Sequence, residues 1–175
     1  MHVVIATDGK LDVETASTFA ASLSGPDGRV TVLTVVEVPR AFLHDMRGQW
    51  GAMDGAGVFS DDELFVDTPA VPQEAPRGWP GDDAMIERYL SDKLEQHTAP
   101  IVSALRTAGV EAEANVVESE NVTNTILEQI DALGADAVVI GSHGQGLFQG
   151  LLGSTGTKIV RRCSRPVLLI RSSTS

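Results

Sequence analysis

Short apolar runs, rich in β-branched residues, alternate along the chain with longer stretches whose apolar residues recur at helical spacing. Short, wholly apolar runs are typical of strands that are buried on both faces of a parallel sheet. The predicted strands of this kind are His2–Thr7, Arg29–Val36, Asp136–Gly141 and Pro166–Arg171, and the more polar segment Glu111–Glu118 is a further predicted strand.

The stretches between these strands predict helices at Asp12–Ser24, Asp82–Thr107, Thr123–Leu133 and Ser154–Cys163. Pro100 predicts a kink or a split in the second of them, because proline removes a hydrogen bond of the helix. Strands separated by helices predict right-handed crossovers and a doubly wound α/β fold, with helices on both faces of a parallel sheet. Ligands of such sheets bind beyond the carboxyl ends of the strands, where the strand order reverses.

One long stretch, Val38 to Pro80, interrupts this pattern. It contains both tryptophans and is rich in proline and glycine, which is typical of a long loop. A short helix near Asp61 to Phe65 is compatible with its sequence. We therefore expect a single domain over residues 1–175 with a loop insertion at about 38–80. That insertion is equally compatible with two interpretations. One is a lid over a ligand, and the other is a surface elaboration or dimer contact.

Charge and composition exclude some classes of binding partner and predict where the protein is located. The formal net charge is −11, so a general nucleic-acid binder or a binder of anionic membranes is not expected. No apolar run approaches the roughly 20 residues of a bilayer span, and no signal-peptide pattern is found. The single cysteine, Cys163, fits a reducing compartment. We expect a cytoplasmic location.

The candidate chemistry is concentrated in Gly141–Gly156, which holds six glycines between an apolar strand and a helix. Glycines let backbone amides approach a phosphate, and the helix N-terminus adds N–H groups and partial positive charge. No acidic residue follows Asp136, whereas five lysines and arginines do. These features favour phosphate binding over a turn that only lets the helix pack closely. The segment also supplies hydroxyl donors at Ser142, Ser154, Thr155 and Thr157.

Two common phosphate-binding motifs do not fit. A dinucleotide-binding glycine motif would follow the first strand, where only Gly9 is present. A Walker loop requires a glycine before its lysine, and Thr157 precedes Lys158 here.

Several segments together resemble the universal stress protein family. They are IATDG at 5–9, VLTVVE at 32–37, GADAVVIGSHG at 134–144 and GSTGTKIVRRCSRPVLLIR at 153–171. Eight residues separate Gly144 from Gly153, one fewer than in the family's glycine pattern. The resemblance implies a five-stranded sheet of order 3-2-1-4-5, Rossmann-like and adenine nucleotide alpha hydrolase-like. It also implies a homodimer that binds ATP or another adenine nucleotide, with or without Mg²⁺.

The resemblance also implies roles for particular residues. Asp8, with Ala6 and Thr7 beside it, matches the position that holds the ribose or base, and the main chain at Val35 matches the one that reads adenine. Asp8 is equally compatible with a turn or helix-cap role. His143 would contact phosphate or face solvent. The residues matched to the phosphate cradle are Gly141, Gly144, Gly153, Ser154 and Thr155.

The function expected from this resemblance is that of a nucleotide-binding stress-response or sensor protein. The apolar run Val167–Ile170 would be an exposed edge strand in that sheet order, which favours a homodimer through it. The shortened glycine loop favours an alternative, a dimeric interaction module of the same fold without nucleotide. A slow nucleotide or phosphoester hydrolase with the insertion as lid is a further alternative. No catalytic residue or metal ligand is assigned, and at most weak ATP hydrolysis is expected.

Overall fold

The computed structural model describes residues 1–38, 45, 47–48, 80–142 and 153–171. In these residues five strands form one parallel sheet with the order β3-β2-β1-β4-β5. The predicted fold class and strand order are therefore confirmed. The elements are β1 (His2–Ala6), α1 (Val13–Ser24), β2 (Arg29–Val36), α3 (Asp82–Thr107), β3 (Glu111–Glu118), α4 (Val122–Ala132), β4 (Ala137–Ser142), α5 (Ser154–Arg162) and β5 (Val167–Arg171).

The chain divides into two compact units, residues 1–37 with 89–175, and residues 38–88. The first unit holds the sheet. In the second, Arg47 forms an ion pair with Asp82, at the start of α3. The predicted helix near Asp61 to Phe65, and most of the predicted insertion, lie outside the described residues. In the part of the chain that is described, every helix falls short of the length or the apolar character of a membrane span.

Local signals in the sequence explain where the helices begin and end. The Asp12 carboxylate accepts a hydrogen bond of 2.7 Å from the Thr15 amide and so caps α1. Hydrogen bonding with the Thr15 side chain, and then with its amide, lowers the pKa of Asp12. Gly109, at φ +79°, follows the end of α3 in a conformation that favours glycine.

A kink or a split of α3 was predicted at Pro100, and the structure shows no split. Pro100 and Gln96, whose carbonyl loses its usual partner to the proline, are both exposed. Solvent can therefore satisfy this carbonyl, and the helix continues through the proline.

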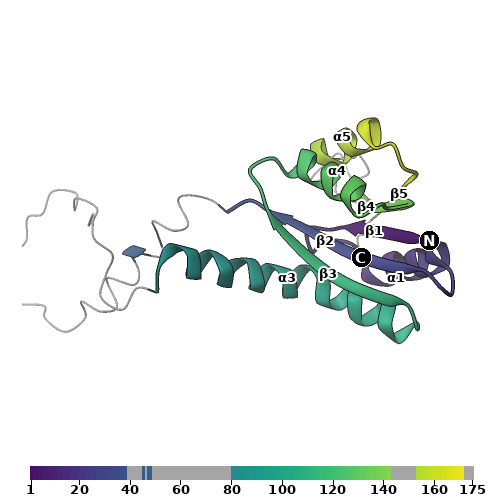
Figure 1. The fold of residues 1–175 in the computed structure, drawn as a ribbon, viewed down its shortest axis with the longest axis horizontal. Helices are drawn as coiled ribbons and strands as arrows, with labels where there is room; N and C mark the ends of the chain where they lie inside the picture. Colours follow the sequence, from purple (N-terminus) through teal and green to yellow (C-terminus); the bar gives the residue numbers. More distant parts are fainter. Residues whose placement is uncertain (39–44, 46, 49–79, 143–152, 172–175) are drawn as a thin grey trace, which may run out of the picture. The chain divides into compact units, whose positions relative to one another are not determined.

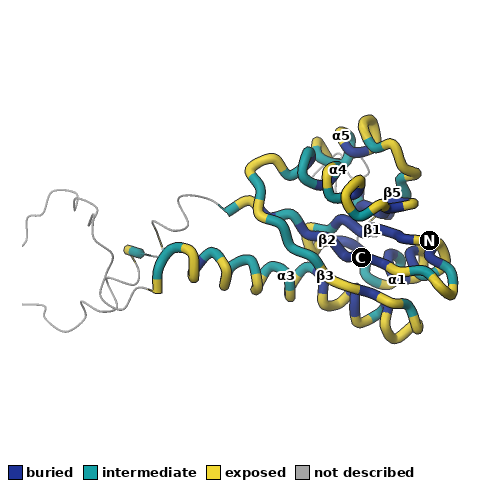
Figure 2. Tube along the Cα trace, in the orientation of Figure 1, coloured by how far each residue is buried: buried dark blue, intermediate teal, exposed yellow. Residues whose placement is uncertain are grey.

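Helices cover both faces of the sheet (Figure 1). Alternate strand residues face opposite sides, so each strand contributes to two cores. Val3, Ile5 and Val32 pack in a cluster with residues of α1 and α3, whereas Val4 and Leu33 pack with α4 and α5. Figure 2 shows that the buried positions concentrate in β1, β2 and β4. The edge strands β3 and β5 are more exposed.

The strand order reverses at β1, which lies between β2 and β4. Ala6, the last residue of β1, is in register with Leu33 of β2 and with Ile140 of β4. The chain leaves these neighbouring strands in opposite directions, which opens a crevice at their carboxyl ends.

Candidate functional site

A cavity of about 280 Å³ lies at this crevice. This volume is near the lower end of the range of roughly 300–1,000 Å³ typical of small-molecule sites. The ends of β1, β2 and β4 contribute to its lining, as do the beginnings of α4 and α5. The lining residues are Ala6, Thr7, Asp8, Leu33, Val35, Val122, Ile126, Ile140, Gly141, Gly153, Ser154, Thr155, Gly156 and Ile159.

The structure brings most of the predicted site residues together in this one cavity. His143 and Gly144 lie outside the described residues, so the cavity's lining says nothing about them. The binding roles of all these residues stay a prediction. The predicted residues that line the cavity are Ala6, Thr7, Asp8, Val35, Gly141, Gly153, Ser154 and Thr155.

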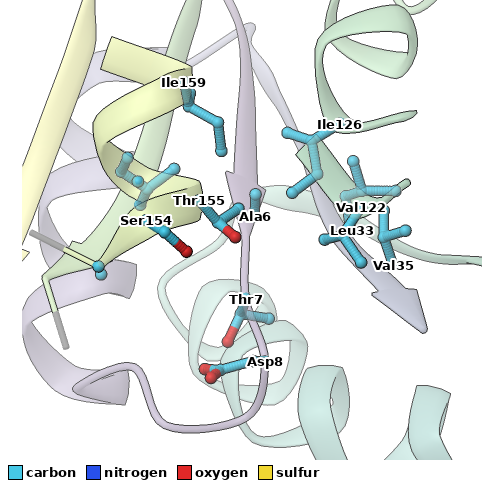
Figure 3. A pocket seen from close by; sticks show the side chains of 14 residues that line it. Ala6, Thr7, Asp8, Leu33, Val35, Val122, Ile126, Ser154, Thr155 and Ile159 are labelled. Atoms are coloured by element: carbon cyan, nitrogen blue, oxygen red, sulfur yellow. The ribbon is translucent and has the colours of Figure 1, made fainter. Parts of the chain in front are cut away.

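Sequence reasoning missed much of the apolar part of the lining. Leu33 lies two residues before Val35 and therefore shares its face of β2. The two-residue period of a strand could have predicted that Leu33 lines the cavity beside Val35. Val122 and Ile126 are four residues apart on α4 and so lie on one face of that helix. Figure 3 shows the side chains of Leu33, Val35, Val122 and Ile126 gathered on one side of the cavity.

The polar groups lie on other sides of the cavity. In Figure 3, Thr7 and Asp8 lie at one end, and Ser154 and Thr155 project from the start of α5. The cavity thus has an apolar wall built by β2 and α4, a carboxylate after β1, and a helix N-terminus.

Hydrogen bonds define the turn that carries Asp8. The Thr7 amide donates to the carbonyl of Leu33 at 3.0 Å, which extends the pairing of β1 with β2 by one residue. The Gly9 amide donates to Thr7 Oγ1 at 3.0 Å, and the Lys10 amide donates to Asp8 Oδ1 at 3.2 Å. The Asp8 side chain is 53% exposed. A partly exposed carboxylate of this kind can accept hydrogen bonds from hydroxyl groups of a ligand.

The N-terminus of α5 suits an anion. Its N-cap, Gly153, has no side chain that could accept a hydrogen bond from the first amides of the helix. The first turn contains no acidic residue, and Ser154 and Thr155 add hydroxyl donors. Arg161 and Arg162 lie in the last turn, at the opposite end of the helix, where they complement its dipole.

Ser142, predicted as a further hydroxyl donor, does not line the cavity. Its Oγ is buried and has no hydrogen-bond partner among the described residues. Within those same ranges, no three His, Cys, Asp or Glu side chains are grouped so that they could hold a metal ion.

Comparison with known proteins identifies the family. The model of the universal stress protein family matches residues 64–171, more than half of the chain. The chain belongs to the universal stress protein family. It is 32% identical over 85 residues to universal stress protein G of Shigella flexneri, a match that covers 49% of this chain and 59% of the relative. The match thus spans somewhat over half the length of that protein.

Solved structures of similar fold match nearly the whole chain. One, a hypothetical protein studied for structure-based assignment of its biochemical function, has a TM-score of 0.64 at 16% identity, covering 99% of this chain and 97% of that one. A universal stress family protein of Arabidopsis thaliana with AMP bound has a TM-score of 0.55 at 13% identity, covering 99% and 93%. A universal stress protein in complex with cAMP has a TM-score of 0.51 at 19% identity, covering 99% and 98%. At these identities the likeness shows the shared fold.

Proposed function

We propose that this universal stress family protein binds an adenine nucleotide in the cavity at the carboxyl ends of β1, β2 and β4. The observation that carries the proposal is the distribution of polarity around that cavity. Its apolar wall, its carboxylate and its helix N-terminus correspond in chemistry to the base, the ribose and the phosphate of a nucleotide. The AMP and cAMP bound to proteins of the same fold support this assignment.

Each part of the cavity has a distinct task in this proposal. The base packs between β2 and α4, against Val35 and Ile126, where removing apolar surface from water favours binding. Asp8 accepts hydrogen bonds from the ribose hydroxyls. The first amides of α5, with Ser154 and Thr155, donate to phosphate oxygens, as helix N-termini do for many anions. Titration with different nucleotides decides how many phosphates the cavity binds and whether ATP requires Mg²⁺.

The test begins by denaturing the purified protein and analysing the released small molecules by chromatography. The protein without ligand is then titrated by calorimetry with AMP, cAMP, and ATP with Mg²⁺. We expect about one adenine nucleotide per chain. Absence of bound nucleotide, and of heat with all three, would refute the proposal and favour the interaction module.

Two carboxylates that lie close in sequence provide a matched pair of variants. Asp8→Asn removes the charge that lines the cavity and should weaken binding by about tenfold or more, because hydrogen bonds to charged groups contribute roughly 1.5–3 kcal/mol. Asp12→Asn removes a carboxylate that caps α1 and does not line the cavity. The second variant should bind nucleotide like the wild type.

We also propose that the protein forms a homodimer through β5, as part of a cytoplasmic stress response. The two edges of the sheet differ in a way that supports this. β3 carries exposed Glu111 and Glu113, whereas the exposed residues of β5 include Leu169, at 41%. Charged edges resist pairing with another strand, and apolar edges invite it.

Light scattering tests this dimer. Leu169→Lys should give a monomer, because it places a charge within the apolar edge. Ala114→Lys is the control, since Ala114 is an exposed apolar residue of β3, the opposite edge strand of the sheet, and should leave the mass unchanged. A dimeric Leu169→Lys variant would overturn the interface.

A further inference from the structure

His97 of α3 packs against the back of the turn that carries Asp8. A Cβ atom placed on Gly9 would lie 2.7 Å from Cδ2 of the His97 ring, closer than side chains come in real contacts. Gly9 also has φ +85°, a conformation that favours glycine. The turn therefore lies directly on the imidazole, with no room for a side chain between them.

A hydrogen bond ties the same ring to β2. His97 Nδ1 lies 2.9 Å from Oγ1 of Thr34, a residue with no exposed surface. Thr34 stands between Leu33 and Val35, both of which line the cavity on the opposite face of the strand. His97 thus contacts the turn after β1 directly and is bound to the strand that forms the apolar wall.

Burial lowers the pKa of His97 below its ordinary value of 6.5, and the positive charges of Lys93 and Lys10 lower it further. The carboxylate of Asp8 acts in the opposite direction, because it attracts the protonated ring. The ring is therefore neutral at pH 7, and protonation below pH 6.5 creates a cation that attracts Asp8 from behind the turn.

We propose that His97 is a positioning residue of the nucleotide cavity: in its neutral form it holds the Thr7–Gly9 turn so that Asp8 faces the ligand, and in its protonated form it draws that carboxylate away. The inference rests on the proposed function and adds a pH-dependent regulation of the same site. His97 itself does not line the cavity and has no direct role toward the ligand.

The test measures affinity at pH 7.5 and 5.5, with adenosine as the probe and AMP alongside it. Adenosine carries no phosphate, whose own ionisation near pH 6 would otherwise contribute to the profile. For the wild type we expect affinity to fall as the pH decreases from 7.5 to 5.5, by about fivefold once the ring is protonated, which is the lower end of the usual coupling between sites. The sign follows because the protonated ring and the ligand compete for Asp8.

His97→Asn keeps an amide close to the position of Nδ1 but has no ring and does not titrate. It should bind several-fold more weakly at pH 7.5, and its affinity should change much less between the two pH values. His2→Asn is the matched control. His2 is buried, and its Nε2, like Nδ1 of His97, lies close to a β2 threonine, 2.8 Å from Oγ1 of Thr31, but at the amino end of the sheet. This control should retain the wild-type pH dependence.

Thr34→Val keeps the His97 ring and removes only its hydrogen bond to β2. This variant tests the positioning role independently, in case His97→Asn fails to fold. It should weaken binding at pH 7.5 and still respond to pH. If His97→Asn binds adenosine as the wild type does at both pH values, the positioning role is wrong while nucleotide binding stands. If the wild type binds neither adenosine nor any nucleotide, the proposed function itself fails. Melting temperatures at both pH values establish that each variant is folded.

Discussion

Placing a carboxylate at the start of α5 should stabilise the protein and weaken its binding of phosphate at the same time. Ser154 is the first residue of α5; it is exposed and lines the cavity. No acidic residue occupies the first turn of this helix, so Ser154→Asp adds the first negative charge there. The helix dipole attracts this charge, whereas a bound phosphate is repelled by it.

The two effects are large enough to measure. An acidic residue in the first turn contributes about 0.3–1 kcal/mol to stability. For a chain of this length that corresponds to a melting temperature higher by about 1–4 °C. AMP carries a charge of about −1.5 to −2 on its phosphate. At about 5 Å and an effective permittivity of about 40–80, repulsion from Asp costs roughly 1.2–3.3 kcal/mol, or about tenfold to a few hundredfold in affinity.

The assay combines melting temperatures with calorimetric titration of AMP and of adenosine. Adenosine should bind Ser154→Asp nearly as it binds the wild type, because it lacks the phosphate. The loss of AMP affinity should shrink at about 1 M salt, where charges are screened within about 3 Å. Ser154→Asn has a similar shape without the charge and is the control. Equal losses for AMP and adenosine would refute the placement of the phosphate at α5.

Two further changes test the fold that carries the site. Leu33→Ala should lower the free energy of unfolding by about 2–5 kcal/mol in urea titrations, because Leu33 is fully buried; a loss below about 1 kcal/mol would contradict its place in the core. Asp12 has a lowered pKa, so its stabilising effect is present above 3.8 and is lost as the pH falls through its folded value. Asp12→Asn should therefore reduce the loss of stability below pH 3.8, and an unchanged pH profile would contradict the cap.

The alternation of strands and helices was predictable because apolar residues are spaced differently along a helix and along a buried strand. The β-branched runs that became β1, β2 and β4 were apolar on both faces, as a strand between two helical layers must be. The clustering of Asp8, Val35 and Gly153 followed from the rule that ligands bind at the carboxyl ends of strands. The continuity of α3 through Pro100 was not predictable from the proline alone, because it depends on that side of the helix being exposed.

Contacts between residues of different helices and strands were harder to predict from the sequence. Ile126 and Ile159 were recognisable as apolar residues of helices, but nothing local indicates that both reach the same cavity as Leu33. His97 had no sequence signal beyond its being one of four histidines without metal-ligand spacing. Its relation to Gly9 and Thr34 arises only because α3 crosses behind the ends of β1 and β2.

The two halves of the candidate site come from different parts of the chain. The family match begins at residue 64, so Asp8 and Leu33 precede it, whereas Ser154 and Ile159 lie within it. Because β1 stands between β2 and β4 in the sheet, the matched segment alone cannot form the cavity. The matched segment supplies groups suited to an anion and the α4 side of the apolar wall, and the unmatched segment supplies the carboxylate and the β2 side of that wall. We therefore expect substitutions at β1 and β2 to change the preference among nucleosides, and substitutions at α5 to change the dependence on phosphate.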